Sequence, residues 1–139
     1  MLHHETISGT VSAVELIQAS YQLGPHCHHA AQLMLVVRGL VICEVAQGLW
    51  LVPPQSALWI PARMTHSMRG VSDLQLYCVY IDPRLTTYLP RKCCVLTVSP
   101  LVRELVIEMS RPLEHRGGAP PDGRMIGIML ERLATAPSE

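Results

Sequence analysis

The sequence predicts a mostly β fold, an antiparallel β-barrel or sandwich followed by two α-helices, and three observations support this. In the first two-thirds of the chain, Gly or Pro interrupts short apolar runs about every eight to twelve residues, as expected for strands joined by turns. In the last third, apolar residues recur at helical spacing. The 139 residues, 49% of them hydrophobic, suffice for one densely packed domain.

The expected strands are apolar runs that end at turn residues. Residues 17–23 alternate apolar with polar side chains, which is the pattern of a half-buried strand. The other runs are mainly apolar, with residues 33–37 continuously so, and Gly or Pro follows each of them within two residues. These runs cover residues 33–37, 40–46, 49–52, 57–60 and 74–81.

Two helices are expected after the strands. Ser99 followed by Pro100 is typical of a helix N-cap and first helical position. A second helix is expected from Asp122, after a Gly- and Pro-rich breaker at residues 117–121. Their apolar stripes could pack on the barrel or pair with a second copy of the protein. The stripe residues, our candidates for a dimer interface, are Leu101, Leu105, Met109, Ile126, Met129, Leu130 and Leu133.

The domain organisation follows from this change of pattern. We assign residues 1–98 to the barrel, and residues 99–139 to a helical pair, for dimerisation or linkage, in the same structural domain. The formal net charge is zero, which argues against nucleic-acid binding by this chain alone. The five cysteines show no Cys-x-x-Cys spacing, and no apolar run reaches the ~18 residues of a membrane span. We therefore expect a cytoplasmic protein with no membrane partner.

The histidines near residue 26 are the strongest functional signal. In a strand, His26 and His28 would share one face about 7 Å apart, so their imidazoles could converge on one ion. Gln32 could add an oxygen and His66 a third nitrogen. Such a donor set suits a divalent transition metal better than Ca or Mg. Zn and Ni are the metals we expect first, and Fe and Cu are also compatible. The alternative interpretation is that the His pair binds no metal and only forms hydrogen bonds with its neighbours.

These residues resemble the two motifs of the cupin superfamily. The first motif is His-x-His, then Glu or Gln, then Gly, and here it consists of His26, His28, Gln32 and Gly39. The second motif ends Pro-x-Gly-x-x-His, and here it consists of Pro61, Arg63 and His66, with Arg63 in the Gly position. The resemblance implies a cupin or jelly-roll double-stranded β-barrel. Because Gln32 replaces the usual Glu, the implied metal site has one negative charge fewer than is usual in the family.

Within the cupins, the chain is similar to the N-terminal domain of AraC-type transcription regulators, over roughly residues 10–136. The segments that carry this similarity are residues 48–54, 57–62, 80–83 and 99–105. The resemblance implies a non-catalytic domain that senses a small-molecule or metal effector and forms a homodimer. DNA would be bound by a C-terminal domain that this chain lacks. The expected effector pocket is formed by Met34, Trp59, Met64 and Met68.

Two other functions remain open. A small metal-dependent cupin enzyme, a dioxygenase or an isomerase, could use the same ion as a Lewis acid. Against this, the two motif segments contain no Asp, Glu or Lys to act as a general base. The chain could also be a structural barrel whose histidine cluster binds nothing.

Overall fold

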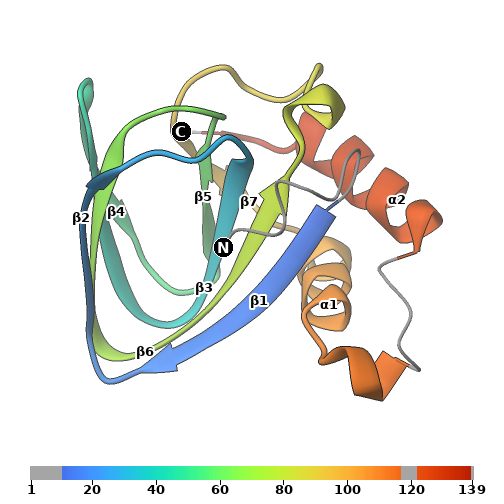
Figure 1. The fold of residues 1–139 in the computed structure, drawn as a ribbon, viewed down its shortest axis with the longest axis horizontal. Coiled ribbons are helices and arrows are strands. Elements are labelled where there is room, and N and C mark those ends of the chain that lie inside the picture. Colours follow the sequence, from blue (N-terminus) through green and yellow to red (C-terminus); the bar gives the residue numbers. More distant parts are fainter. Residues whose placement is uncertain (1–10, 117–121, 139) are drawn as a thin grey trace.

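The computed structural model describes residues 11–116 and 122–138, and its strands form one curled antiparallel sheet with two α-helices against one side (Figure 1). The predicted fold class, a mostly β barrel followed by two helices, is confirmed. The strands are β1 (Val11–Gln18), β2 (Tyr21–His26), β3 (Ala31–Val45), β4 (Gly48–Val52), β5 (Ser56–Ile60), β6 (His66–Ile81) and β7 (Cys94–Thr97). The helices are α1 (Pro100–Met109) and α2 (Gly123–Ala134), with short 3-10 turns at Pro83–Leu85 and Leu113–Arg116.

Two long strands, β3 and β6, pair along almost their whole length and organise the sheet. One half of this pair is flanked by β1, β5 and β7, in the order β1-β6-β3-β5-β7. The other half is flanked by β2, which pairs with β6, and β4, which pairs with β3. The sheet therefore folds over on itself, and its two halves enclose an interior (Figure 1).

The fold in the sheet lies where β3 passes Gly39. The register between β3 and β6 shifts on both sides of Arg38, and Gly39 has a φ of 92°. On the facing strand, Ser72 and Asp73 have φ values of 71° and 52°. Such bulges bend and twist paired strands. The predicted strands at 33–37 and 40–46 are therefore one bent strand, because Gly39 supports a bulge rather than a chain reversal.

Two other predicted strand boundaries were wrong. Residues 17–23 do not form one strand, because β1 ends at Gln18 and β2 begins at Tyr21. The two-residue connection preserves the alternation of polar and apolar side chains, which hid the turn from the sequence pattern. Strand β6 begins at His66 rather than at residue 74, because His66, Met68 and Gly70 alternate as buried positions among more exposed ones.

The sheet buries side chains on both of its faces. In β3, Met34 and Val36 point into the interior between the two halves, whereas Leu33 and Leu35 join the cluster beneath the helices. This follows from the two-residue period of a strand. The interior cluster contains Leu58, Leu74 and Leu76, among others.

Both helices begin where the sequence predicts. The Ser99 hydroxyl accepts a hydrogen bond from the Val102 N–H at 3.2 Å, and the Asp122 carboxylate accepts one from the Arg124 N–H at 2.7 Å. The breaker at residues 117–121 lies outside the described residues. Within the described residues, no helix is long and apolar enough to cross a membrane.

Most of the predicted helix stripe packs against the protein's own barrel. Met109, Met129 and Leu133 are buried in the cluster beneath the helices. Of the other stripe residues, Leu105, Ile126 and Leu130 are partly buried against that cluster, and Leu101 is 41% exposed. The stripe is thus mainly used within one chain, as one of the two sequence interpretations expects.

Replacing Gly39 by Ala should lower the free energy of unfolding by about 2 kcal/mol or more, because an L-residue is strained at positive φ. In addition, the new Cβ would lie 2.8 Å from the Val71 carbonyl oxygen. Urea denaturation measures the change. Gly127→Ala is the matched control, since a Cβ there meets nothing within 4 Å and should stabilise α2 by about 0.5–1 kcal/mol. Equal effects of the two substitutions would contradict the explanation of the bend.

Candidate functional site

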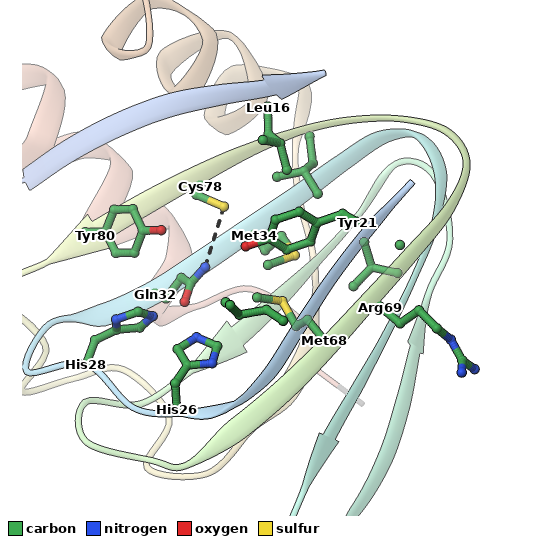
Figure 2. Close-up of a pocket in the computed structure, with 14 residues that line it drawn as sticks. Leu16, Tyr21, His26, His28, Gln32, Met34, Met68, Arg69, Cys78 and Tyr80 are labelled. Carbon is green, nitrogen blue, oxygen red and sulfur yellow. Dashed lines mark hydrogen bonds between the residues drawn. The ribbon is translucent and has the colours of Figure 1, made fainter. Parts of the chain in front are cut away.

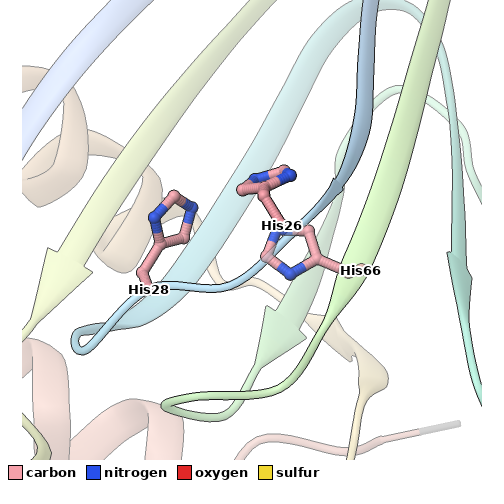
Figure 3. A group of neighbouring side chains, drawn as sticks. All are labelled: His26, His28 and His66. Carbon is pink, nitrogen blue, oxygen red and sulfur yellow. The ribbon is translucent and has the colours of Figure 1, made fainter.

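Three histidines converge at one end of the interior (Figure 3). His26 is the last residue of β2, and it is the cross-strand partner of His66, the first residue of β6. His28 follows in the loop after β2. One ligand nitrogen from each ring lies within 4.8 Å of those from the other two. The closest ring centroids are those of His26 and His66, 4.2 Å apart.

The predicted geometry of the His26–His28 pair was wrong, although the two rings do meet. They do not alternate along one strand, because β2 ends at His26. The chain turns instead, and the His28 carbonyl accepts a hydrogen bond from the Arg63 N–H at 2.7 Å. The ring centroids of His26 and His28 lie 4.8 Å apart. Next to them, His29 is exposed, and its Nδ1 lies 2.9 Å from the Arg63 guanidinium.

Arg63 forms the turn before His66 even though the motif has Gly at this position. Its φ is 63°, in the left-handed region that Gly enters without steric cost. The backbone bond to His28 and the side-chain contact with His29 hold Arg63 in place. The departure from the motif therefore leaves the turn intact.

Backbone carbonyls orient two of the three imidazoles. Nδ1 of His26 lies 2.8 Å from the Gly24 oxygen, and Nδ1 of His66 lies 2.9 Å from the Met64 oxygen. Since a carbonyl oxygen only accepts, the proton of each neutral ring is on Nδ1 and the lone pair is on Nε2. Both Nε2 atoms are buried and, within the described part of the chain, have no hydrogen-bond partner.

The surroundings of His66 favour its neutral form. Burial lowers the pKa of His66, the hydrogen bond to the Met64 carbonyl opposes this shift, and the nearby His26 lowers the pKa further. A histidine must be neutral at the coordinating nitrogen to bind a metal ion. The pKa shift therefore favours the form of His66 that binds metal at neutral pH.

Gln32 lies at the same end of the interior, on β3, and is 1% exposed. Its Nε2 donates to the Cys78 thiol sulfur at 3.5 Å. Its Oε1 is buried without a partner among the described residues, and Figure 2 shows it turned toward His26 and His28. Leaving a buried polar atom unpaired costs about 1–3 kcal/mol, and a ligand or a water molecule bound at this point would supply the partner.

A cavity opens beside these residues, lined by β1, β2, β3 and β6 (Figure 2). The volume open to the centre of a water molecule is about 50 Å³, which is room for a few water molecules or for part of a small ligand that enters through the mouth. The polar lining near the histidines comprises Tyr21, Gln32, Cys78 and Tyr80. The apolar lining includes Leu16, Leu23, Met34, Val41, Met68 and Leu76.

The hydroxyl and thiol groups of the cavity are protonated at neutral pH. Burial raises the pKa of Tyr21 and of Tyr80, and the nearby Cys78 raises both further. Burial also raises the pKa of Cys78 to about 11. These groups therefore serve as hydrogen-bond donors, not as bases or nucleophiles.

The structure brings together some of the predicted pocket residues but not all. Met34 and Met68 line the cavity. Met64 is partly buried beside the histidines, where its carbonyl holds His66, but it does not line the cavity. Trp59 lies on the other face of the sheet, in the cluster beneath the helices, and its indole N–H donates to the Pro90 oxygen at 2.7 Å.

Tyr21, Tyr80 and Cys78 line the cavity although the sequence did not predict them as site residues. Tyr80 is the cross-strand partner of Gln32, and Cys78 is the partner of Met34. Residues 76, 78 and 80 share one face of β6, so the two-residue period links them to each other. The period alone does not say which face is the interior, and only the pairing with β3 decides that.

Comparisons with known proteins show which family this chain is similar to. The sequence matches the family described as the AraC-like ligand binding domain over residues 9–136. It is 34% identical over 114 residues to the HTH-type transcriptional regulator NimR of Escherichia coli (strain K12). That match covers 82% of this chain and 41% of NimR, so the chain spans less than half the length of this curated relative.

Two solved structures show the same fold at low sequence identity. The AraC-like transcriptional activator CuxR has a TM-score of 0.67 at 11% identity, over 94% of this chain and 55% of that chain. ToxT from Vibrio cholerae has a TM-score of 0.58 at 7% identity, over 88% of this chain and 53% of that chain. The family match spans nearly the whole chain, and the relative exceeds 30% identity. This chain therefore belongs to the AraC-like ligand-binding domain family.

Proposed function

We propose that this chain is the non-catalytic effector-sensing and dimerisation domain of a transcription regulator, with a divalent metal ion in its barrel. One observation carries the metal proposal. His26 Nε2, His66 Nε2 and Gln32 Oε1 are buried lone-pair atoms without partners among the described residues. His26 and Gln32 line one end of the cavity, and His66 belongs to the same histidine cluster. An ion bound there would satisfy all three of them, with His28 as a further ligand.

The residues present fit a transition metal. Histidines that bind metal usually donate their second ring N–H to a carbonyl or carboxylate, as His26 and His66 do here. Imidazole donors with one amide oxygen suit Zn, Ni, Fe or Cu, and we propose Zn or Ni first. The ion would supply a fixed positive charge at the end of the cavity.

A binding role explains the cavity better than catalysis does. Among the described residues, no Asp, Glu or Lys lines it. The raised pKa values of Tyr80 and Cys78 leave both protonated at neutral pH, so neither supplies a general base. The cavity thus offers groups that hold a ligand and few that would transform it.

We propose that DNA is contacted by a separate part of a longer regulator. The zero net charge of this chain supports this, since duplex binding requires a local excess of Lys and Arg. The relative NimR is an HTH-type regulator, and the matching region covers 41% of it. In this proposal, residues 99–139 carry the dimer contacts next to the barrel of residues 1–98.

The untagged protein should bind one zinc ion per chain, and His26→Ala or His66→Ala should weaken zinc binding by about 100-fold or more, because each removes a ligand. Calorimetric titration and elemental analysis measure this. His115→Ala is the matched control, since His115 is exposed and lies outside the cluster. A wild-type protein without zinc, or equal losses in all three variants, would refute the metal site.

Leu101→Asp should weaken self-association by about tenfold or more, because it places a charge in the proposed apolar interface on α1. Leu101 is the most exposed member of the predicted helix stripe, at 41%. Sedimentation analysis over a concentration series measures the dissociation constant. Leu49→Asp is the control, since Leu49 is 58% exposed on β4, away from the helices. A monomeric wild-type chain would rule out this interface.

A further inference from the structure

The donors around the proposed ion are all uncharged. Three imidazoles and the Gln32 amide supply lone pairs but no negative charge. Among the described residues, no carboxylate lines the cavity, and the guanidinium of Arg69, its one charged lining residue, points away from it (Figure 2). A divalent ion in this site would keep its full charge in an apolar interior. Burying a charge without a counter-charge is strongly unfavourable.

The other polar groups of the cavity also favour a negative ligand. Figure 2 shows the hydroxyl oxygens of Tyr21 and Tyr80 directed to the middle of the cavity, near Cys78 and Gln32. Both groups are phenol hydroxyls, which donate hydrogen bonds. Hydrogen bonds to an ionised acceptor are shorter and stronger than those to a neutral one. The cavity therefore combines protonated hydroxyls with an end that attracts anions.

The remaining surface of the cavity is apolar. Met34, Val41 and Leu76 are buried in the interior, and Met68 lies beside them. Leu16 lines the cavity from β1. Flexible Met side chains adapt to the shape of an apolar group. A ligand that fits has one charged end and a small apolar body.

We propose that the effector of this domain is a small organic monoanion, whose carboxylate-type head binds at the histidine end and whose apolar body lies against Met34, Met68 and Leu76. The inference rests on the metal ion of the proposed function. Gln32 is the specificity-determining residue, because a carboxylate at this position would supply the negative charge that the effector otherwise brings.

The first test compares matched acids and amides of the same shape. Zinc-loaded and metal-free protein are titrated calorimetrically with acetate, butyrate and hexanoate, and with the corresponding amides. For the zinc-loaded protein, each acid that binds should do so about tenfold more tightly than its amide, because only the acid neutralises the buried charge. Affinity should rise by about fourfold for each added methylene that is buried. Metal-free protein should not prefer the acids.

Cobalt provides a readout that does not depend on affinity alone. In cobalt-loaded protein, hexanoate should shift the visible absorption of the ion, because its carboxylate enters the coordination sphere, whereas hexanamide should leave the spectrum unchanged. If no acid binds more tightly than its amide to zinc-loaded protein, the inference is wrong. If the wild-type protein fails to bind zinc at all, the metal part of the proposed function is wrong instead.

The second test changes the charge at position 32. Gln32→Glu should tighten zinc binding and weaken hexanoate binding, each by about tenfold, because added ligand charge strengthens the site for cations and replaces the anion. Gln18→Glu is the control, since Gln18 is exposed at the end of β1 and outside the cavity, and it should change neither constant. Equal or tighter hexanoate binding by folded Gln32→Glu protein would overturn the assignment. If that variant does not fold, the acid and amide titrations of the wild-type protein still decide.

Discussion

The antiparallel pairing of β3 with β6 is the constraint on which the rest of this structure depends. It places Gln32 opposite Tyr80 and Met34 opposite Cys78, which forms the polar part of the cavity. Strand β6 also pairs with β2, which brings His26 next to His66. Because each strand exposes alternate side chains to opposite faces, a shift of one residue in this register would move the cavity lining to the helix side.

Both faces of the same strands are buried, and each face has its own role: one packs against the helices and the other lines the cavity. The outward residues Leu33, Leu35 and Val79 anchor the helices, while the inward residues form the cavity. A ligand that changes the spacing of β3 and β6 would therefore act directly on the sheet on which α1 and α2 pack.

The histidine cluster depends on the backbone as much as on its side chains. Carbonyls of Gly24 and Met64 orient His26 and His66 so that each presents an unprotonated nitrogen. The turn at Arg63 holds the loop that carries His28. The same cluster lacks a carboxylate among the described residues. In the proposed function, this absence links the binding of the ion and of the effector through charge.

The sequence by itself determined the fold class and the start of both helices, because these depend on residue period and capping residues. Motif spacing also identified the residues that gather at one end of the interior, which are His26, His28, Gln32 and His66. The bent course of β3, the turn between β1 and β2, and the face on which Trp59 lies were decided only by the tertiary structure. The tertiary structure also decided that Tyr21, Cys78 and Tyr80 line the cavity. The physical reason is that a local pattern sets which side chains share a face, whereas long-range strand pairing decides which face becomes the interior.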